Sequence, residues 1–537
     1  MRCDARVQGT VLKKAFIFKE VKMKKFARLL GFDPVEKQTS VRTEIMAGIV
    51  TFLSMAYILT VNPNSILYAG TADIRWSSLF IATAFGAIIG TLLMAFLAKM
   101  PLAQASGMGL NSLVGSIIGG GVGAFAYGIS FSIGQAFMMV LISGVIFLLL
   151  SVITVKGKTF RELVFDGMPV AVRGAISVGI GLFIAYIGFQ NAGIIVHNQY
   201  TQVAFVDFTN WGTQTVNAAY PDAAYAAKTA AVALIGLFLI AVLDKLNVKG
   251  SVILGILGAT VVGIPFGVTN VKVITGTEGI SWKFWENFAN FFSVGEKSVF
   301  GSFTSVFTEG FPAGSLFTVI MLIITMCMID MFDTMGTIVG CCSGNRILSD
   351  ENDKPRNYGK IMVCDAVATC AGAALGTSTV TTFVESGAGV SAGGRTGLTA
   401  FTTACMFLLA IFAMPLFAMI PSAATASALI YVGVLMMKNN VKNVDFSNAI
   451  NATTGFLTIV VMVLSYSITK GIGVGMISYT LMSAIAYLVE LVKYALTKRN
   501  AEKSAEAAEA PKWNVSAVAL IVTALFLVYF FVPATLF

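Results

Sequence analysis

The chain has 537 residues, of which 56% are hydrophobic and 12% are charged, with a mean hydropathy of +0.82, whereas a soluble domain carries about 25% charged residues. This composition excludes an ordinary soluble protein, a disordered chain and a collagen-like repeat, and a single histidine, His197, with seven cysteines leaves little material for metal, haem or redox chemistry. The net charge of +9 would indicate nucleic-acid binding only if the basic residues clustered on a polar domain.

Residues 1–43 form a basic N-terminal tail with six lysines between Lys13 and Lys25. The tail lacks an uninterrupted apolar run of signal-peptide length and a small-residue cleavage site. We therefore predict that it is retained and lies in the cytoplasm.

Fifteen uncharged or nearly uncharged stretches follow the tail, each suited to one membrane span of ~20 residues. They lie at about 45–62, 77–98, 101–120, 131–155, 174–190, 229–243, 250–267, 315–340, 361–376, 377–394, 397–419, 422–437, 450–468, 472–489 and 514–536. If the first fourteen cross the membrane, thirty of the 36 Lys and Arg lie on the cytoplasmic side, as the positive-inside rule requires. The sequence predicts an all-α, multi-pass protein of the cell (cytoplasmic) membrane, and leaves open whether 514–536 crosses.

Three segments lie outside these spans. Two long, polar outer connections, 191–228 and 268–312, are predicted, and the second contains WKFWENFANFF (282–292), whose aromatic residues are typical of a helix at the membrane interface. Residues 500–512, NAEKSAEAAEAPK, predict a solvated linker.

The two halves of the chain resemble each other. KGSVILGILG begins the seventh span at Lys249, and KGIGVGMISY begins the fourteenth at Lys470. The third and tenth spans are both rich in Gly, Ser and Thr and are interrupted, at 105–112 and 376–394. Because seven is odd, two such halves insert in opposite orientations, and paired interrupted spans indicate the substrate site of a transporter.

Four acidic residues lie inside apolar spans, where a charge is costly and needs a structural or functional reason. Asp330 and Asp333 are three residues apart in the eighth span and therefore lie on one helical face. Glu385 follows a run of Thr and Ser in the tenth span, where a half-helix N-terminus would receive its carboxyl group. We interpret all three as site residues, and a buried structural acid is the alternative for each. Asp365, in a span of Cys, Ala and Gly, is interpreted as structural.

In the third span, the glycines of the segment Gly107 to Asn111 would let a ligand approach the backbone, and Asn111 offers both a donor and an acceptor. A helix-packing segment is the alternative. Glu44 and Arg395 lie near predicted span ends, which favours an interfacial role. The sequence has no G-x-x-x-x-G-K-[ST] motif, so we expect coupling to an ion gradient, with carboxyl groups as proton carriers.

At these motifs the sequence resembles the AzgA-like purine permeases of the nucleobase–cation symporter family, over about residues 31–490. The matching segments are TEIMAGIVTFLSMAYILTVNP (43–63), GMGLN (107–111), IGLFIAYIGFQNAGI (180–194), MFDTMGT (331–337), STVTTFVESGAGVSAGGRTGLTA (378–400) and ATASALIYVGVLMM (424–437). The resemblance implies a fold of fourteen spans in a 7+7 inverted repeat, shared with uracil permeases. It also implies a core domain (44–155 and 313–420), a gate domain (156–270 and 421–495), an outer connection (271–312) and a C-terminal linker with an apolar segment (496–537).

The resemblance further implies that Asn111, Asp330 and Glu385 bind a purine and that Asp333 is a critical neighbour, with Glu385 and Asp330 carrying the proton. Supporting positions in the same motifs are Gly107, Gly109, Thr337, Thr382, Ser386 and Gly387. The family reads A-P-G-M-G-L-N-A-[YF] where this chain has Ser106 in place of proline and Ser112-Leu113 as the last pair.

The sequence therefore predicts a secondary transporter that imports purine nucleobases (adenine, guanine or hypoxanthine) with protons and needs no cofactor. The alternatives are a transporter of the same fold for uracil, xanthine or an anion, and a membrane enzyme or channel. An enzyme would need a nucleophile–base pair or a metal cluster, which the sequence lacks. Na⁺ as the coupling ion and a homodimer stay open.

Overall fold

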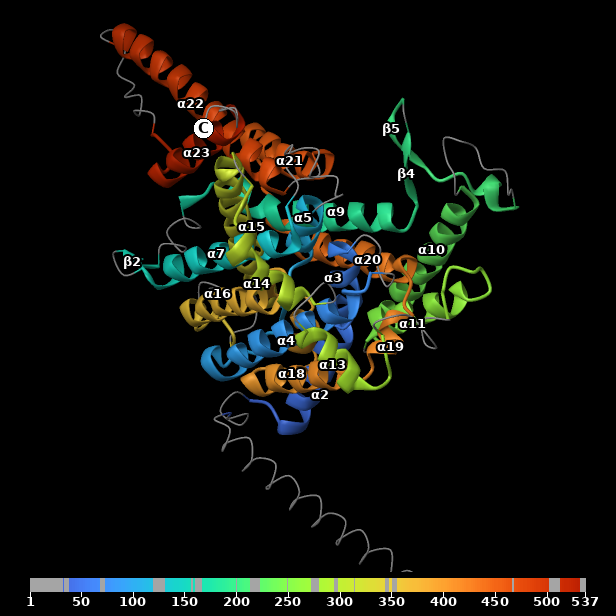
Figure 1. Ribbon diagram of the computed structural model, residues 1–537. Coiled ribbons are helices and arrows are strands. Elements are labelled where there is room, and N and C mark those ends of the chain that lie inside the picture. The colour runs from blue at the N-terminus through green and yellow to red at the C-terminus, as the bar shows by residue number, and fades with distance from the viewer. Residues whose placement is uncertain are drawn as a thin grey trace, which may run out of the picture.

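The computed structural model describes residues 32, 38–67, 73–118, 131–155, 158–159, 167–198, 200–212, 223–248, 250–271, 280–293, 298–312, 314–342, 347–349, 355–465, 468–501 and 512–531. Most of these residues are helical (Figure 1). Most of the predicted basic tail and of the linker at 500–512 lies outside the described residues.

The first predicted span consists of two helices, α2 (Val41–Met55) and α3 (Ile58–Ile66). Pro63 within α3 has no amide hydrogen, and its ring crowds the carbonyl group four residues earlier. Before Pro63 the chain forms a 3₁₀-type turn, because the amides of Leu59 and Thr60 each donate to the carbonyl group three residues earlier. The break lies at Ala56 and Tyr57, and the Tyr57 side chain is buried.

The third and tenth spans are each a short strand followed by a helix. Strand β1 (Gln104–Ser106) precedes α5 (Met108–Ile117), and β6 (Val380–Thr382) precedes α17 (Ser386–Ser391). The strands pair antiparallel, with Gln104 opposite Thr382 and Ser106 opposite Val380. The extended segments thus supply each other's backbone hydrogen bonds, which lipid cannot do. The predicted interruption of these two spans is confirmed.

The remaining long helices complete the two halves. In the first half they are α4 (Trp76–Leu93), continued by the π-helix η2 (Met94–Ala98), α7 (Ile133–Val152), α9 (Val170–Asn191), α10 (Ala223–Lys245) and α11 (Ser251–Gly263). In the second half they are α15 (Leu316–Cys342), α16 (Tyr358–Leu375), α18 (Gly397–Ile411) with the short α19 (Met414–Ala418), α20 (Ser422–Asn440), α21 (Ala449–Leu464) and α22 (Ile468–Ala501).

Helix packing repeats when the two halves are exchanged. The pair α4 and α18 has its counterpart in α16 and α7, and the pair α2 and α18 has its counterpart in α15 and α7. Likewise α10 packs on α11 and α20, while α21 packs on α22 and α9 (Figure 1). This exchange is the signature of a two-fold internal repeat, and it confirms the predicted repeat of the two halves.

Helices α9 and α20 are the exchange partners that lie directly against each other. A Cβ atom at Gly433 would lie 2.5 Å from the carbonyl oxygen of Gly181, so the two backbones touch where neither residue has a side chain. Small residues at such a contact let membrane helices approach closely.

The outer connections contain short elements. Strands β4 (Ile195–Asn198) and β5 (Gln202–Phe205) form a hairpin that carries the exposed His197, followed by the 3₁₀ helix η3 (Phe208–Gly212). The second connection contains α13 (Phe284–Phe292) and α14 (Val299–Glu309). In α13, Phe291 is buried while Trp285 and Phe292 are exposed, as expected of an interfacial helix. Two smaller elements are the hairpin of β2 (Thr154–Val155) with β3 (Lys158–Thr159) and the 3₁₀ helix η4 (Val441–Asn443).

Helix α22 is longer than predicted. Its apolar run was expected to end at about residue 489, but the helix continues to Ala501 because the Ala, Leu, Lys and Glu residues that follow favour helix strongly. The C-terminal helix α23 (Ala517–Phe531) runs antiparallel along α22: the hydroxyl groups of Thr480 and Thr523 are hydrogen-bonded at 2.9 Å, and the rings of Tyr487 and Trp513 lie 5.2 Å apart.

Eight helices of the described residues are long and apolar enough to cross a membrane, and six further apolar helices are shorter. The predicted organisation as a multi-pass helical protein is thus confirmed, and the number of fourteen crossings stays a prediction.

Glycine at position 115 is required by the contact between α3 and α5. A Cβ atom there would lie 2.2 Å from the carbonyl oxygen of Ser65. We expect Gly115→Ala to lower the free energy of unfolding by ~1–3 kcal/mol, because helix backbone must shift. At Gly359, near the start of α16, an added Cβ meets nothing within 4 Å, so Gly359→Ala is the matched control. Thermal unfolding of the purified variants in detergent tests this, and equal shifts in both would contradict it.

Candidate functional site

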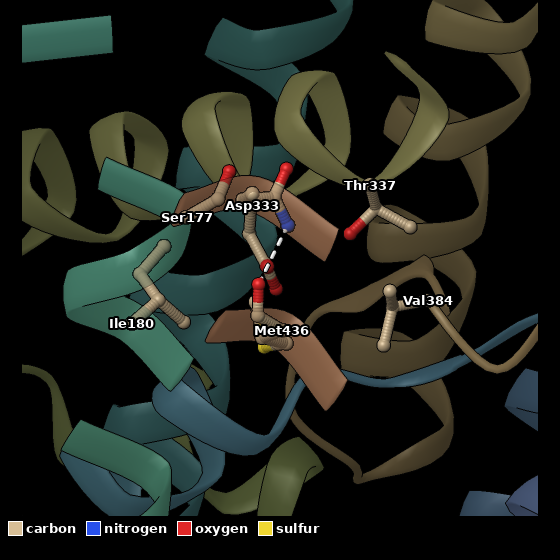
Figure 2. Close-up of a pocket in the computed structure, with 7 residues that line it drawn as sticks. Ser177, Ile180, Asp333, Thr337, Val384 and Met436 are labelled. Carbon is tan, nitrogen blue, oxygen red and sulfur yellow. Dashed lines mark hydrogen bonds between the residues drawn. The ribbon is translucent and has the colours of Figure 1, made fainter. Parts of the chain in front are cut away.

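Helix α15, the two interrupted spans and the α9–α20 pair surround a partly open cavity of about 300 Å³, a volume that includes space open to solvent. Its lining residues are Gly107, Met108, Ile184, Asp333, Thr337, Thr382, Phe383, Val384, Glu385 and Met436. A smaller cavity of about 230 Å³ adjoins it and shares Asp333, Thr337, Val384 and Met436. Figure 2 shows Asp333 projecting between Thr337 on one side and Ser177 and Met436 on the other.

Glu385 is the acidic residue that the tenth span contributes to this cavity. It is the N-cap residue of α17, and its side chain is 5% exposed. The hydroxyl group of Tyr57 donates a hydrogen bond to Oε1 of Glu385. Oε2 is buried and has no hydrogen-bond partner in the part of the chain that the structure describes. A buried carboxylate oxygen without a partner is costly, so a ligand with an N–H or O–H group would be stabilised here.

Asp333 faces the same cavity from α15. Gly107 makes the approach possible: its amide donates to the carbonyl oxygen of Thr379 at 2.9 Å, and a Cβ atom there would lie 2.6 Å from Thr381 Cγ2 and 3.9 Å from Asp333 Oδ2. A larger residue would collide with Thr381 of β6 and would fill the space next to Asp333. The cavity therefore presents two carboxyl groups, from Asp333 and Glu385, that can accept hydrogen bonds from one ligand.

The structure places the other two predicted binding residues behind the cavity wall. Asp330 is buried and accepts a hydrogen bond from Thr369 Oγ1 of α16 at 3.1 Å. Asn111 is buried in α5, where its side-chain oxygen accepts from the hydroxyl of Ser378. Neither residue lines either described cavity. Of the two aspartates, Asp333 lines the cavity and Asp330 does not, whereas the resemblance implied that Asp330 binds the purine and that Asp333 is its neighbour.

The supporting residues divide in the same way. Thr337, Thr382 and Gly107 line the cavity, whereas three others stabilise its frame: the amide of Ala103 donates to Ser386 Oγ at 2.9 Å, Gly387 lies against Cys341, and Gly109 is buried in α5.

Asp365 lies at the junction of both strands with α15 and α16. Its Oδ1 accepts from Gln104 Nε2 at 3.0 Å and from the amide of Thr382 at 3.1 Å, and its Oδ2 accepts from Thr334 Oγ1 at 2.7 Å. The carboxyl group is fully buried and does not line the cavity. These contacts fit the structural role that the sequence suggested for it.

Residues 42–474 match the family described as Permease family. The chain belongs to this permease family. It is therefore a transporter and not an enzyme, and a multi-pass protein of the cell membrane, as predicted.

Curated relatives of this permease are named as purine transporters. The chain is 33% identical to the adenine permease AdeP of Escherichia coli, covering 83% of this chain and 88% of AdeP. It is also 33% identical to the guanine/hypoxanthine permease PbuO of Bacillus subtilis, covering 84% of this chain and 93% of PbuO. These similarities confirm the family resemblance seen in the sequence.

Solved structures confirm the fold of this permease. The transmembrane domain of the cyanobacterial bicarbonate transporter BicA is similar with a TM-score of 0.53 at 15% identity, covering 81% of this chain and 96% of that domain. The structure of SLC26A9 is similar with a TM-score of 0.52 at 12% identity, covering 89% of this chain and 70% of that chain. At these identities the likeness concerns the fold alone.

Glu44 of the permease is fully buried, which differs from the interfacial role expected for it. Its carboxyl group accepts hydrogen bonds from the amide of Arg395 at 2.8 Å and from the hydroxyls of Thr396 and Thr399 at 2.9 and 2.6 Å. Thr396 is the N-cap residue of α18, so Glu44 caps this helix and connects the first span to the eleventh. A position near the end of an apolar run did not reveal this, because the partners lie 351 to 355 residues away.

Sequence reasoning missed Tyr57. The residue lies in a segment that matched the family, but nothing in an apolar run marks one tyrosine as a partner of a distant carboxylate. The usable signal was Asn62-Pro63, because a proline inside a span indicates a helix break within the preceding turns.

Proposed function

We propose that this permease imports purine nucleobases together with protons, and that the cavity between Asp333 and Glu385 is the substrate site. The observation that carries the proposal is the buried Oε2 of Glu385, an acceptor on a cavity-lining residue that has no hydrogen-bond partner among the described residues. The names of the relatives, adenine permease and guanine/hypoxanthine permease, support purines as the substrate class.

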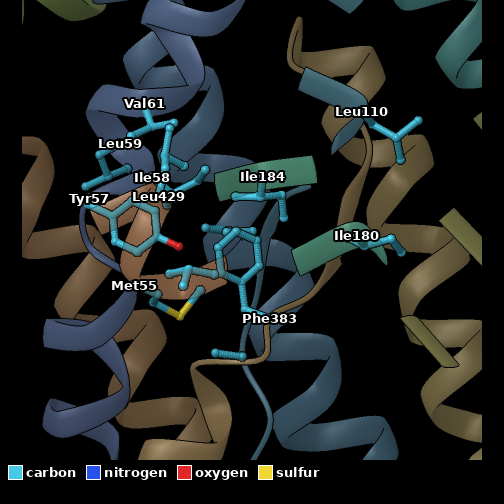
Figure 3. Packing of buried hydrophobic residues seen from close by; sticks show 14 of the residues in the cluster. Met55, Tyr57, Ile58, Leu59, Val61, Leu110, Ile180, Ile184, Phe383 and Leu429 are labelled. Atoms are coloured by element: carbon cyan, nitrogen blue, oxygen red, sulfur yellow. The ribbon is translucent and has the colours of Figure 1, made fainter. Parts of the chain in front are cut away.

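The chemistry of the lining suits a planar, nitrogen-rich base. Adenine, guanine and hypoxanthine carry N–H groups along their edges, which match the carboxyl groups of Asp333 and Glu385. Ile184, Phe383 and Met436 supply apolar surface for the faces of the ring. Figure 3 shows Phe383 and Ile184 beside Tyr57 in the same hydrophobic cluster.

An anion is a weaker candidate. The fold likeness to BicA suggests bicarbonate as an alternative substrate class. However, the described residues that line the two cavities include two acids and neither Lys nor Arg. A site with that charge would repel an anion.

We further propose that residues 44–155 and 313–420 form a core domain, and that residues 156–270 and 421–495 form a gate domain. Support comes from the packing: the strands and α15 line one side of the cavity, and Ile184 of α9 and Met436 of α20 line the other. All the polar groups of the larger cavity belong to the proposed core domain.

Proton coupling predicts a definite pH dependence. A carboxyl group that binds one proton in each transport cycle loads less often as external protons become scarce, so uptake should fall as external pH rises. We expect the protein to take up radiolabelled adenine, guanine or hypoxanthine and not uracil. A protonophore should abolish this purine uptake. Omission of Na⁺ should leave the rate unchanged. Uptake that requires Na⁺ and ignores the protonophore would contradict proton coupling, and uptake of uracil alone would contradict the substrate class.

The two aspartates of α15 should differ in effect. Because Asp333 lines the cavity, Asp333→Asn exchanges an acceptor for a donor next to the substrate. We expect the affinities for purine analogues to change relative to one another by about tenfold or more, which alters their ranking. Asp330 bonds to Thr369 instead, so Asp330→Asn should lower turnover and keep the ranking. Inhibition profiles against a panel of analogues measure both effects. A changed profile in Asp330→Asn with a normal one in Asp333→Asn would show that the roles are exchanged.

A further inference from the structure

Tyr57 and Glu385 form a buried pair at the wall of the cavity. Tyr57 lies at the break between α2 and α3, where the chain turns, and it is 1% exposed. Figure 3 shows its hydroxyl group pointing toward the side on which Phe383 lies. That hydroxyl donates to Glu385 Oε1 and also lies 3.6 Å from the sulfur atom of Met108, another residue of the cavity lining.

The pair treats the two oxygens of Glu385 differently. Oε1 is held by Tyr57, while Oε2 is buried without a described hydrogen-bond partner. A free carboxylate binds two parallel donors through both oxygens, and such bidentate pairs are the strong ones. The phenol takes one of the two lone-pair positions of Oε1, so the oxygen that Glu385 offers a ligand without competition is Oε2.

We propose that Tyr57 is a specificity-determining positioning residue that restricts Glu385 to a single hydrogen bond with the substrate. This inference rests on the proposed function of the cavity as a purine site. It concerns the edge of the base: guanine has adjacent N1–H and 2-amino donors, which fit both oxygens of a free carboxylate, whereas hypoxanthine has N1–H and lacks the 2-amino group. While Tyr57 holds Oε1, the 2-amino group of guanine gains no second bond from Glu385.

The wild-type protein should therefore bind guanine and hypoxanthine with similar affinity, because Glu385 makes the same hydrogen bond with the N1–H of each base. Removal of the Tyr57 hydroxyl frees Oε1 for the 2-amino group, and the affinity for guanine relative to hypoxanthine increases. The ring of phenylalanine keeps the packing against Met55 and Ile58, so Tyr57→Phe changes the hydrogen bond alone.

The experiment is competition of unlabelled guanine and hypoxanthine against radiolabelled hypoxanthine on purified protein. In Tyr57→Phe we expect the ratio of guanine to hypoxanthine affinity to rise about tenfold, the effect of one added bond to a charged group. The matched control is Tyr431→Phe, since Tyr431 of α20 is also a buried tyrosine and does not line either cavity. Its ratio should stay that of wild type.

A ratio in Tyr57→Phe equal to that of wild type would overturn the inference, even if both affinities fell, because a purely structural tyrosine lowers them together. The wild-type protein supplies a test that does not depend on the folding of the variant: guanine and hypoxanthine should bind within about threefold of each other. A wild-type preference for guanine of a hundredfold would also overturn the inference. Failure of wild-type protein to bind any purine would instead overturn the proposed function, and the inference with it.

Discussion

Glu385→Gln is expected to lower the affinity for purines by between about thirtyfold and a few thousandfold, equivalent to ~2–5 kcal/mol. The substitution keeps the volume of the side chain but replaces a charged acceptor with an amide. The ligand N–H that would donate to Oε2 then loses a charge-assisted partner at a buried position. Glu385→Ala should abolish binding, because it removes both oxygens and the partner of Tyr57.

Binding of a radiolabelled purine to purified protein measures this loss directly. Glu286→Gln is the matched control, since Glu286 lies in the exposed part of α13 and its carboxyl group pairs with Lys283 at 3.2 Å. That variant should bind purines as wild type does. Unchanged affinity in Glu385→Gln, with the protein folded, would disprove the assignment of Glu385 to the substrate site.

Asp365→Ala is expected to lower the free energy of unfolding by ~3–5 kcal/mol and to reduce the amount of folded protein in the membrane. The carboxyl group accepts from Gln104 on β1, Thr382 on β6 and Thr334 on α15, so its removal leaves three buried donors without this acceptor. This one side chain therefore joins both strands to α15.

Thermal unfolding in detergent and the yield of folded protein test the Asp365 prediction. The control is Asp445→Ala near the surface, where the carboxyl group also accepts hydrogen bonds, from the amide of Ser447 at 2.8 Å and from Asn451 Nδ2 at 2.6 Å. Water replaces those partners, and only a small change is expected. If Asp365→Ala kept wild-type stability but lost purine binding, Asp365 would belong to the substrate site instead.

Sequence patterns were sufficient for features that depend on local composition. The runs of apolar residues located the helices, and the excess of Gly, Ser and Thr at 105–112 and 376–394 located the two interruptions. Sequence patterns were insufficient where hydrogen-bond partners far apart in the chain decide which side chains are buried and which line the cavity. Which of the two aspartates of α15 lines the cavity depends on such a partner: Thr369 of α16 donates a hydrogen bond to Asp330, and Asp333 is left facing the cavity. The burial of Glu44 depends likewise on Thr396 and Thr399 of the second half.

The length of α22 shows a different limit. Charged residues after residue 489 ended the apolar run, and hydropathy alone placed the end of the helix there. Helix propensity continued the helix to Ala501, because charge limits membrane insertion and does not limit helix formation. Residue type pointed to acids in two spans, and one acid from each, Asp333 and Glu385, lines the cavity. Which of the neighbouring aspartates faces it required the structure, and the roles of both acids in binding stay predictions.

The pairing of β1 with β6 has a consequence for biosynthesis. Gln104 and Thr382 are 278 residues apart in the chain, so the ribosome completes most of the protein between the two strands. Throughout that interval the extended segment of the third span has no strand partner, and each unsatisfied backbone group in lipid costs several kcal/mol. Contacts of such long range also form late in folding. The first half expressed alone should therefore leave β1 unformed, and the central pair of strands should assemble only after the second half has been inserted.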